Sequence, residues 1–136
     1  MYNFTSFKNW LSESQTIKVD NVDLPIIIVK KVDWPEGKDD LTEFDAESNV
    51  VRVRSDYDYK KDPFNNMKHE LIHYLLHKKG FKDDGEEYPT NNTEEKAYTY
   101  QFKAFKKQGI KNLEDIIDKI GKRHHMETLK KYWNNA

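Results

Sequence analysis

Two histidines that lie four positions apart, His69 and His73, could do chemistry together, because Glu70 directly follows the first of them. In an α-helix, residues i and i+4 share one face, so the two imidazoles can point at a single metal ion. Glu70 would lie beside this pair, where its carboxylate can act as a general base on water rather than bind the ion. The spacing therefore predicts a zinc site with His69 and His73 as ligands and Glu70 as the catalytic base.

The competing interpretation is an amphipathic helix that happens to carry two core histidines. At the chain's own frequencies of histidine and glutamate, the pattern would arise by chance on the order of 0.01 times. Apolar neighbours also surround the histidines, namely Leu71, Ile72, Leu75 and Leu76. Imidazoles in such surroundings need polar partners, and a metal ion provides one.

A zinc site of this kind needs a third protein ligand and an open position for water. The chain has no cysteine, so that ligand must be His, Asp or Glu, and Lys79 occupies the place where a third histidine could follow. We favour Glu94, because Ala97 one turn later would let its helix approach the first closely. The alternatives are Glu95 and the acids of the preceding loop, Asp83, Asp84, Glu86 and Glu87. Whichever of Glu94 and Glu95 is not a ligand would stabilise the helix N-terminus.

The remaining histidines are not expected to bind this ion. His77 lies two turns, or about 11 Å, along the helix from the first ligand. His124 and His125 are adjacent and so point in different directions. Tyr88 and Tyr98 could each donate a hydrogen bond to a developing oxyanion, but in a chain with 8 tyrosines we interpret both as packing residues.

The helix that carries the histidines is predicted from signals at its two ends. Asp62 is a suitable N-cap, and Pro63 suits the first helical turn. Gly80 suits a left-handed C-terminal cap after about Lys79. The helix is therefore expected between these positions.

Further helices follow from apolar residues at helical spacing. After a polar loop over residues 81–92, Thr93 is expected to cap a helix that runs to about Lys107. Apolar stripes also predict helices over residues 4–14 and over the tail from 112 to 133.

Strands are predicted where β-branched residues gather or alternate with polar ones. Residues 24–32 suit a strand that is buried on at least one face. Residues 41–45 and 50–54 suit a hairpin around a turn at 46–49. With the helices, these strands indicate a single α+β domain over residues 1–136.

Composition limits the classes of partner and location. Lysine and arginine number 23 against 24 for aspartate and glutamate, so overall charge gives no strong signal for nucleic acid or an anionic membrane. No stretch approaches the roughly 18 apolar residues of a membrane span, and the N-terminus lacks a secretion signal. We expect a soluble, cytoplasmic protein without a membrane partner.

Three motifs in order resemble the ImmA/IrrE family of small gluzincin-type metallopeptidases, which phages, integrative elements and bacterial genomes encode. They are the strand pair ending at residues 50–54, His69-Glu70-Leu71-Ile72-His73 followed by apolar residues and His77, and Glu94-Glu95-Lys96-Ala97-Tyr98. The resemblance spans about Asn49 to Phe105. Ile72 replaces a small residue, and residues 101–105 replace the family's small-residue run.

The resemblance implies a minimal zincin-like domain, in which a small, mainly antiparallel sheet packs against the active-site helix and further helices lie at the C-terminus. It implies His69, His73 and Glu94 as zinc ligands and Glu70 as the general base. It also implies a protein or peptide substrate, such as a repressor or regulator.

The predicted function is hydrolysis of a peptide bond by a zinc-dependent metalloendopeptidase. The strand over residues 50–54 could lie beside the cleft and align an extended substrate by β-augmentation. The alternative is a non-catalytic zinc-binding module for regulation or protein interaction on the same fold, because an intact Glu70 does not by itself bring a substrate to the site.

Overall fold

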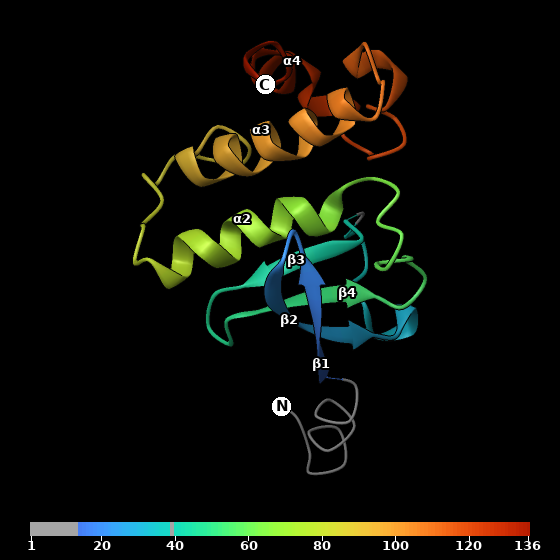
Figure 1. The fold of residues 1–136 in the computed structure, drawn as a ribbon, viewed down its shortest axis with the longest axis vertical. Coiled ribbons are helices and arrows are strands. Elements are labelled where there is room, and N and C mark those ends of the chain that lie inside the picture. Colours follow the sequence, from blue (N-terminus) through green and yellow to red (C-terminus); the bar gives the residue numbers. More distant parts are fainter. Residues whose placement is uncertain (1–13, 39) are drawn as a thin grey trace.

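The computed structural model describes residues 14–38 and 40–136 (Figure 1). Its strands are β1 (Ser14–Val19), β2 (Val22–Val29), β3 (Thr42–Asp45) and β4 (Val50–Arg54), and its α-helices are α2 (Asn66–Lys78), α3 (Asn92–Lys107) and α4 (Met126–Asn135). Short 3-10 helices cover Lys31–Asp33, Leu113–Asp115 and Arg123–His125. The expected α+β class and the C-terminal helices are confirmed.

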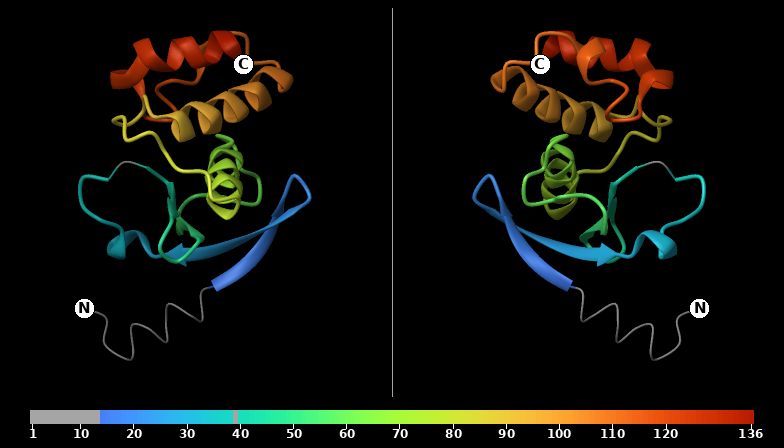
Figure 2. Two further views of the ribbon diagram at one scale, coloured as in Figure 1. Left: turned by 90° about the vertical axis from the view of Figure 1, so that its left-hand side faces the viewer. Right: turned by 90° about the vertical axis from the view of Figure 1, so that its right-hand side faces the viewer.

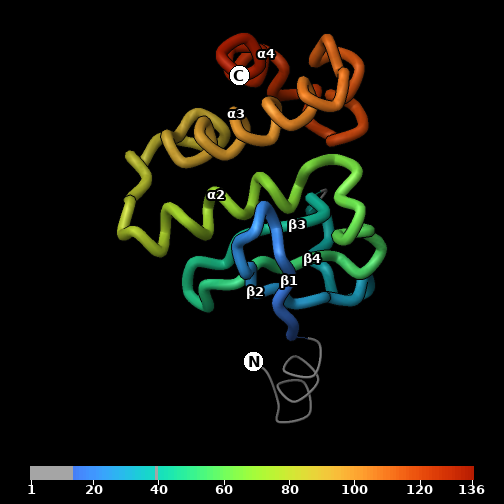
Figure 3. The backbone as a smooth tube through the Cα atoms, viewed as in Figure 1, coloured from blue at the N-terminus to red at the C-terminus, as the bar shows by residue number. Residues whose placement is uncertain are grey.

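The elements form layers with α2 in the middle. The sheet lies on one side of α2, and α3 and α4 follow on the other side (Figures 1 and 2). The chain leaves α2 through a loop and returns alongside it as α3 (Figure 3). Helix α2 is therefore enclosed by the sheet and by α3, which explains why residues on two of its faces are buried.

The sheet has the strand order β1-β2-β4-β3. Strands β1 and β2 pair antiparallel, β2 and β4 pair parallel, and β3 and β4 pair antiparallel, as expected for the hairpin over residues 41–54. The sheet is thus mainly antiparallel, as predicted. Strand β3 lies at one edge of the sheet, so one side of its backbone is not paired within the sheet.

Two N-terminal predictions differ from the structure. Strand β1 was not predicted, because most of its side chains are exposed and give little apolar signal. It pairs with β2 through a tight turn in which Asp20 and Asn21 both have positive φ angles, of 50° and 67°. The helix expected over residues 4–14 lies outside the described residues, except that Ser14 begins β1. Strand β2 ends at Val29, before the expected residue 32.

The helix caps also differ from the predicted ones. Helix α2 begins at Asn66, directly after Asn65, whose backbone is in the left-handed conformation. Asp62 lies outside the helix, and its side chain accepts a 3.0 Å hydrogen bond from the backbone N–H of Met67. Asp62 thus satisfies a first-turn donor without being the N-cap residue. The predicted end of α2 is confirmed by Gly80, whose φ is 78°.

The tail is helical over only part of the predicted range. Residues 113–125 form two 3-10 helices joined by turns, and α4 begins at Met126. Gly121 has a φ of 70°, which ends any continuous helix there. Most residues of the apolar stripes are nevertheless buried. Leu113, Ile116, Ile117, Leu129, Tyr132 and Trp133 form one core cluster with Tyr98, Phe102 and Phe105 of α3, and the other two stripe residues, Ile120 and Met126, are partly buried against it.

A second core cluster joins the sheet to α2. It contains Leu24, Ile26, Val51, Val53, Tyr57, Met67, Leu71 and Tyr74. Helix α2 is therefore fixed against the sheet by one face, which leaves a different face of the same helix to meet α3. Among the described residues, no helix has the length and apolar character needed to cross a membrane.

Candidate metal centre

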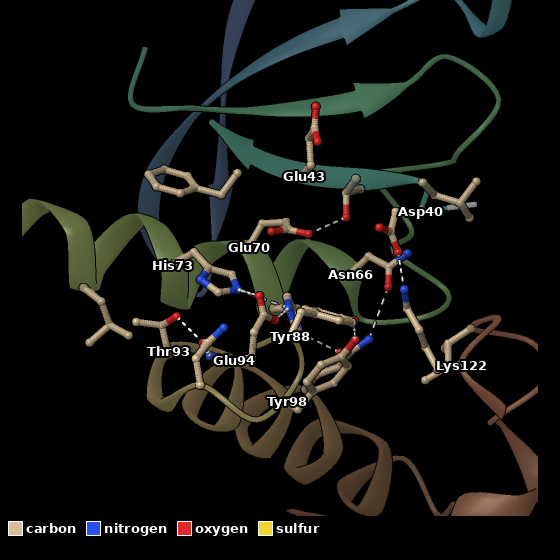
Figure 4. A pocket seen from close by; sticks show the side chains of 18 of the residues that line it. Asp40, Glu43, Asn66, Glu70, His73, Tyr88, Thr93, Glu94, Tyr98 and Lys122 are labelled. Atoms are coloured by element: carbon tan, nitrogen blue, oxygen red, sulfur yellow. Dashed lines mark hydrogen bonds and ion pairs between the residues drawn. The ribbon is translucent and has the colours of Figure 1, made fainter. Parts of the chain in front are cut away.

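The face of α2 that meets α3 brings three potential ligands together. Nε2 of His69 lies 2.9 Å from Oε1 of Glu94, and Nε2 of His73 lies 3.0 Å from Oε2 of Glu94 (Figure 4). The two Nε2 atoms are 3.3 Å apart. Residues i and i+4 of α2 thus supply both imidazoles, as the spacing predicted, and the first turn of α3 supplies the carboxylate.

These separations suit a metal ion. Ligand atoms at about 2.0–2.1 Å from a tetrahedral ion lie roughly 3.3–3.4 Å from each other, within about half an ångström of the three observed separations. In the part of the chain that the structure describes, His69, His73 and Glu94 are the one group of His, Cys, Asp or Glu residues with ligand atoms this close, all within 4.8 Å of one another. The group could hold a metal ion.

The structure distinguishes between the candidate acids. The side chain of Glu94 is 14% exposed and faces α2, whereas Glu95 is exposed. The face of α3 that carries Glu94 packs inward, because Ala97, Tyr98, Gln101 and Phe105 are buried. The loop acids Asp83, Asp84, Glu86 and Glu87 are all exposed and do not join the group.

The cap of α3 is Asn91 and not the predicted Thr93. The Asn91 side chain accepts a 2.9 Å hydrogen bond from the backbone N–H of Glu94, and the Thr93 hydroxyl donates to the same oxygen. This arrangement fixes the first turn of α3 at the residue that carries the ligand carboxylate. The change of cap does not alter which face of the helix is buried.

The electrostatics of the group favour a carboxylate at its centre. Burial alone would raise the pKa of Glu94, but His69 and His73 outweigh it and lower that pKa well below its usual range. Burial opposes the charged form of His69, but the Glu94 carboxylate outweighs burial and raises the pKa of this imidazole. Glu94 therefore stays ionised and attracts positive charge, which a proton or a metal cation can supply.

Gln101 fixes the orientation of His69, a role that no pattern in the sequence predicts. Its Oε1 lies 2.9 Å from Nδ1 of His69. Its Nε2 donates to the Phe64 carbonyl oxygen at 2.8 Å and to Oδ1 of Asn66 at 3.2 Å. Because the amide nitrogen is used in this way, the oxygen must face the imidazole, so Nδ1 carries the proton and Nε2 is free to bind a metal.

Glu70 is buried on α2 at 6% exposure, next to the edge strand β3. The Thr42 hydroxyl donates a 2.7 Å hydrogen bond to its Oε2. Burial raises the pKa of Glu70, and the nearby His69 and His73 oppose this increase only in part. A raised pKa makes the carboxylate more basic, which suits a group that accepts and later returns a proton. Thr42 was also missed by sequence reasoning.

A cavity of about 680 Å³ opens onto the three ligands and Glu70. The edge strand β3 lines one side, the loop before α3 lines another, and residues 118–122 line one end. Tyr88 and Tyr98, interpreted from the sequence as packing residues, both line this cavity and share a hydrogen bond between their hydroxyls. Each is therefore a polar feature of the site.

The other histidines lie away from the three ligands, as predicted. His77 is exposed, contacts the Phe44 ring at 5.5 Å and lies 3.3 Å from Oδ1 of Asn49. His125 packs against the Tyr88 ring at 5.3 Å, with His124 beside it. None of the three joins the metal-binding group.

The prediction that the strand over residues 50–54 aligns a substrate by β-augmentation names the wrong strand. Strand β4 is hydrogen-bonded to β2 on one side and to β3 on the other, so its backbone groups are already used. The free edge beside the cavity belongs to β3.

Comparisons with family models, with curated proteins and with solved structures found no match to this chain.

Proposed function

We propose that this protein is a zinc-dependent metallopeptidase in which His69, His73 and Glu94 hold the ion and Glu70 is the general base. The observation that carries the proposal is the convergence of three ligand atoms within 4.8 Å in a cavity that also contains the buried Glu70. The sequence resemblance to ImmA/IrrE metallopeptidases points the same way.

Zinc is the metal that this ligand set favours. Two imidazole nitrogens and one carboxylate, with a fourth position open, are typical of catalytic zinc sites. Calcium and magnesium prefer sites built from oxygen ligands, so two histidines disfavour them. Zinc bound here would supply a Lewis acid that lowers the pKa of a water molecule and polarises a peptide carbonyl.

The protein's own groups would move the protons. Glu70 would take a proton from the attacking water with its carboxylate and return it to the leaving amine. Its raised pKa suits both steps, and the bond from Thr42 holds one carboxylate oxygen so that the other remains available. Gln101 would keep Nε2 of His69 directed at the ion.

An extended peptide could lie along β3. This strand is at the sheet edge, and Leu41, Thr42, Glu43 and Phe44 line the cavity. Unpaired backbone groups on an edge strand can bind a peptide by adding a strand to the sheet. The proposed substrate is therefore a peptide segment in extended conformation, such as an exposed segment of a regulatory protein.

The proposal is tested with zinc-loaded wild-type protein and Glu70→Gln. Both are incubated with a mixture of unstructured peptides, and the products are identified by mass spectrometry. We expect the variant to keep one zinc per chain but to lose about 100-fold or more in cleavage rate, because only the base is removed. Equal cleavage by both proteins would refute a role for Glu70. Zinc binding without any cleavage would favour the non-catalytic module.

A further inference from the structure

One end of the cavity contains three polar side chains that the proposed reaction does not use. We call Tyr88, Tyr98 and Lys122 the donor cluster. The Tyr98 ring packs edge-on against His69 at 4.4 Å, and its hydroxyl is hydrogen-bonded to that of Tyr88. The ammonium of Lys122 lies 5.3 Å from the Tyr88 ring centre. A chain of contacts thus leads from the metal-binding group to Lys122 (Figure 4).

Lys122 is a buried charge in this cluster. Its side chain is 13% exposed, and its ion-pair partner, Asp40, is 41% exposed. Burial opposes the charge on Lys122, but Tyr88 and Asp40 outweigh it and raise its pKa, so the ammonium is charged at neutral pH. An ammonium has three hydrogens to donate; the bond to Asp40 uses one of them, and the Tyr88 hydroxyl accepts another. One hydrogen of Lys122 is therefore left for a ligand.

The two tyrosine hydroxyls add a further donor. Together they carry two hydrogens, and the bond between them uses one. The other hydrogen can be donated to a ligand oxygen. Burial raises the pKa of Tyr88 to about 12, so the Tyr88 hydroxyl keeps its hydrogen at neutral pH. The cluster thus offers a positive charge and a hydroxyl donor to an anionic group.

The direction of β3 indicates which part of a peptide would reach the cluster. Asp40 lies just before Thr42, where β3 begins, and its ion pair with Lys122 joins the sheet to residues 118–122 at that end of the cavity. Antiparallel pairing is the commoner and slightly more stable arrangement for an added strand. A peptide paired in this way with β3 would have its C-terminal end at Thr42, toward Lys122.

We propose that the donor cluster is a subsite for a carboxylate of the peptide, on the C-terminal side of the bond to be cleaved. The inference rests on the proposed function for the position of that bond. A carboxylate matches the cluster because it accepts hydrogen bonds from an ammonium and a hydroxyl at once. It is supplied either by the free C-terminus of the peptide or by an Asp or Glu side chain.

Binding measurements test the subsite without any need for turnover. The probes are an N-acetylated alanine tripeptide with a free C-terminus and its C-terminal amide, measured by calorimetry with zinc-loaded and metal-free protein. We expect the acid to bind about tenfold more tightly than the amide in both forms. A second pair of amidated peptides, one with Glu and one with Gln, tests a side-chain carboxylate. Equal affinities within both pairs would overturn the proposal.

Two variants test whether the cluster is responsible. Lys122→Met keeps an unbranched side chain that is one atom shorter and leaves Asp40 partly exposed to water. We expect it to abolish the preference for the acid. Lys119→Met removes an exposed lysine of the same cavity and should keep the preference. Tyr88→Phe, which lacks the hydroxyl, should reduce it. A preference that survives in Lys122→Met, or that requires zinc, would place the carboxylate elsewhere and refute the subsite. If the wild-type protein prefers the acid but cleaves no peptide, the subsite would stand and only the peptidase function would be contradicted.

Discussion

Thr42 on β3 donates a 2.7 Å hydrogen bond from its hydroxyl to Oε2 of Glu70 on α2. Both side chains are buried, at 5% and 6% exposure, so water competes little for this bond. The bond couples the edge strand that would bind a peptide to the carboxylate that would act as its base. One carboxylate oxygen is held by Thr42, and the other is left to accept a proton.

Thr42→Val should lower the rate of peptide cleavage about tenfold, because the base loses a bond that orients it. Valine has nearly the same shape, so zinc content should change little, whereas the Glu70 oxygen left without its donor should lower the free energy of unfolding by about 1–3 kcal/mol. Steady-state kinetics with zinc-loaded protein make the measurement. Thr99→Val is the matched control, since the Thr99 hydroxyl bonds the Glu95 carbonyl oxygen on an exposed part of α3. Equal kcat values for wild type and Thr42→Val would contradict the positioning role.

Glu94→Gln and Glu95→Gln form a matched pair, because both remove one negative charge from the first turn of α3. We expect Glu94→Gln to weaken zinc binding by more than about 100-fold, since it removes a charged ligand. Glu95→Gln should leave affinity nearly unchanged, since it removes only an exposed contact with the helix dipole. Competition titration against a zinc-binding dye gives both constants. Loss of affinity in the Glu95 variant alone would assign the ligand to Glu95.

Gln101→Leu should weaken zinc binding about 10- to 100-fold, the usual effect of removing a partner that orients a histidine ligand. Without the amide oxygen, the His69 ring can rotate or change its tautomer. Gln108→Leu, at the C-cap of the same helix, is the control, since Gln108 pairs with Asn65 instead. The same titration applies, and unchanged affinity in Gln101→Leu would show that His69 is oriented by packing alone.

Zinc should stabilise the folded protein, because His69 and His73 lie on α2 and Glu94 lies on α3. At a free zinc concentration 100 times the dissociation constant, the gain in free energy of unfolding would be about 2.7 kcal/mol. The melting temperature should rise on addition of zinc and return to its starting value on addition of a chelator. His69→Ala should show neither zinc binding nor the shift. A shift of equal size in His69→Ala would mean that zinc stabilises the protein at some other site.

Sequence reasoning succeeded where the signal lies within one element. The i, i+4 spacing of His69 and His73 fixes their common direction as soon as the segment is helical. Ala97, one turn after Glu94, likewise favours Glu94 over Glu95, and it is buried as expected even though Asn91 and not Thr93 caps the helix. The hairpin of β3 and β4 followed from alternation of apolar and polar residues.

Patterns in the sequence are therefore enough to predict the α+β class, the helix that carries His69, Glu70 and His73, and the choice of Glu94. The packing of the elements was needed to show which strand has the free edge, and that Thr42, Gln101 and Lys122 contact Glu70, His69 and Asp40, respectively. These partners lie 28, 32 and 82 positions apart along the chain. Periodicity reports which face of an element is buried, because burial depends on the element's own residues. It does not report what that face meets, because that depends on how separate elements pack.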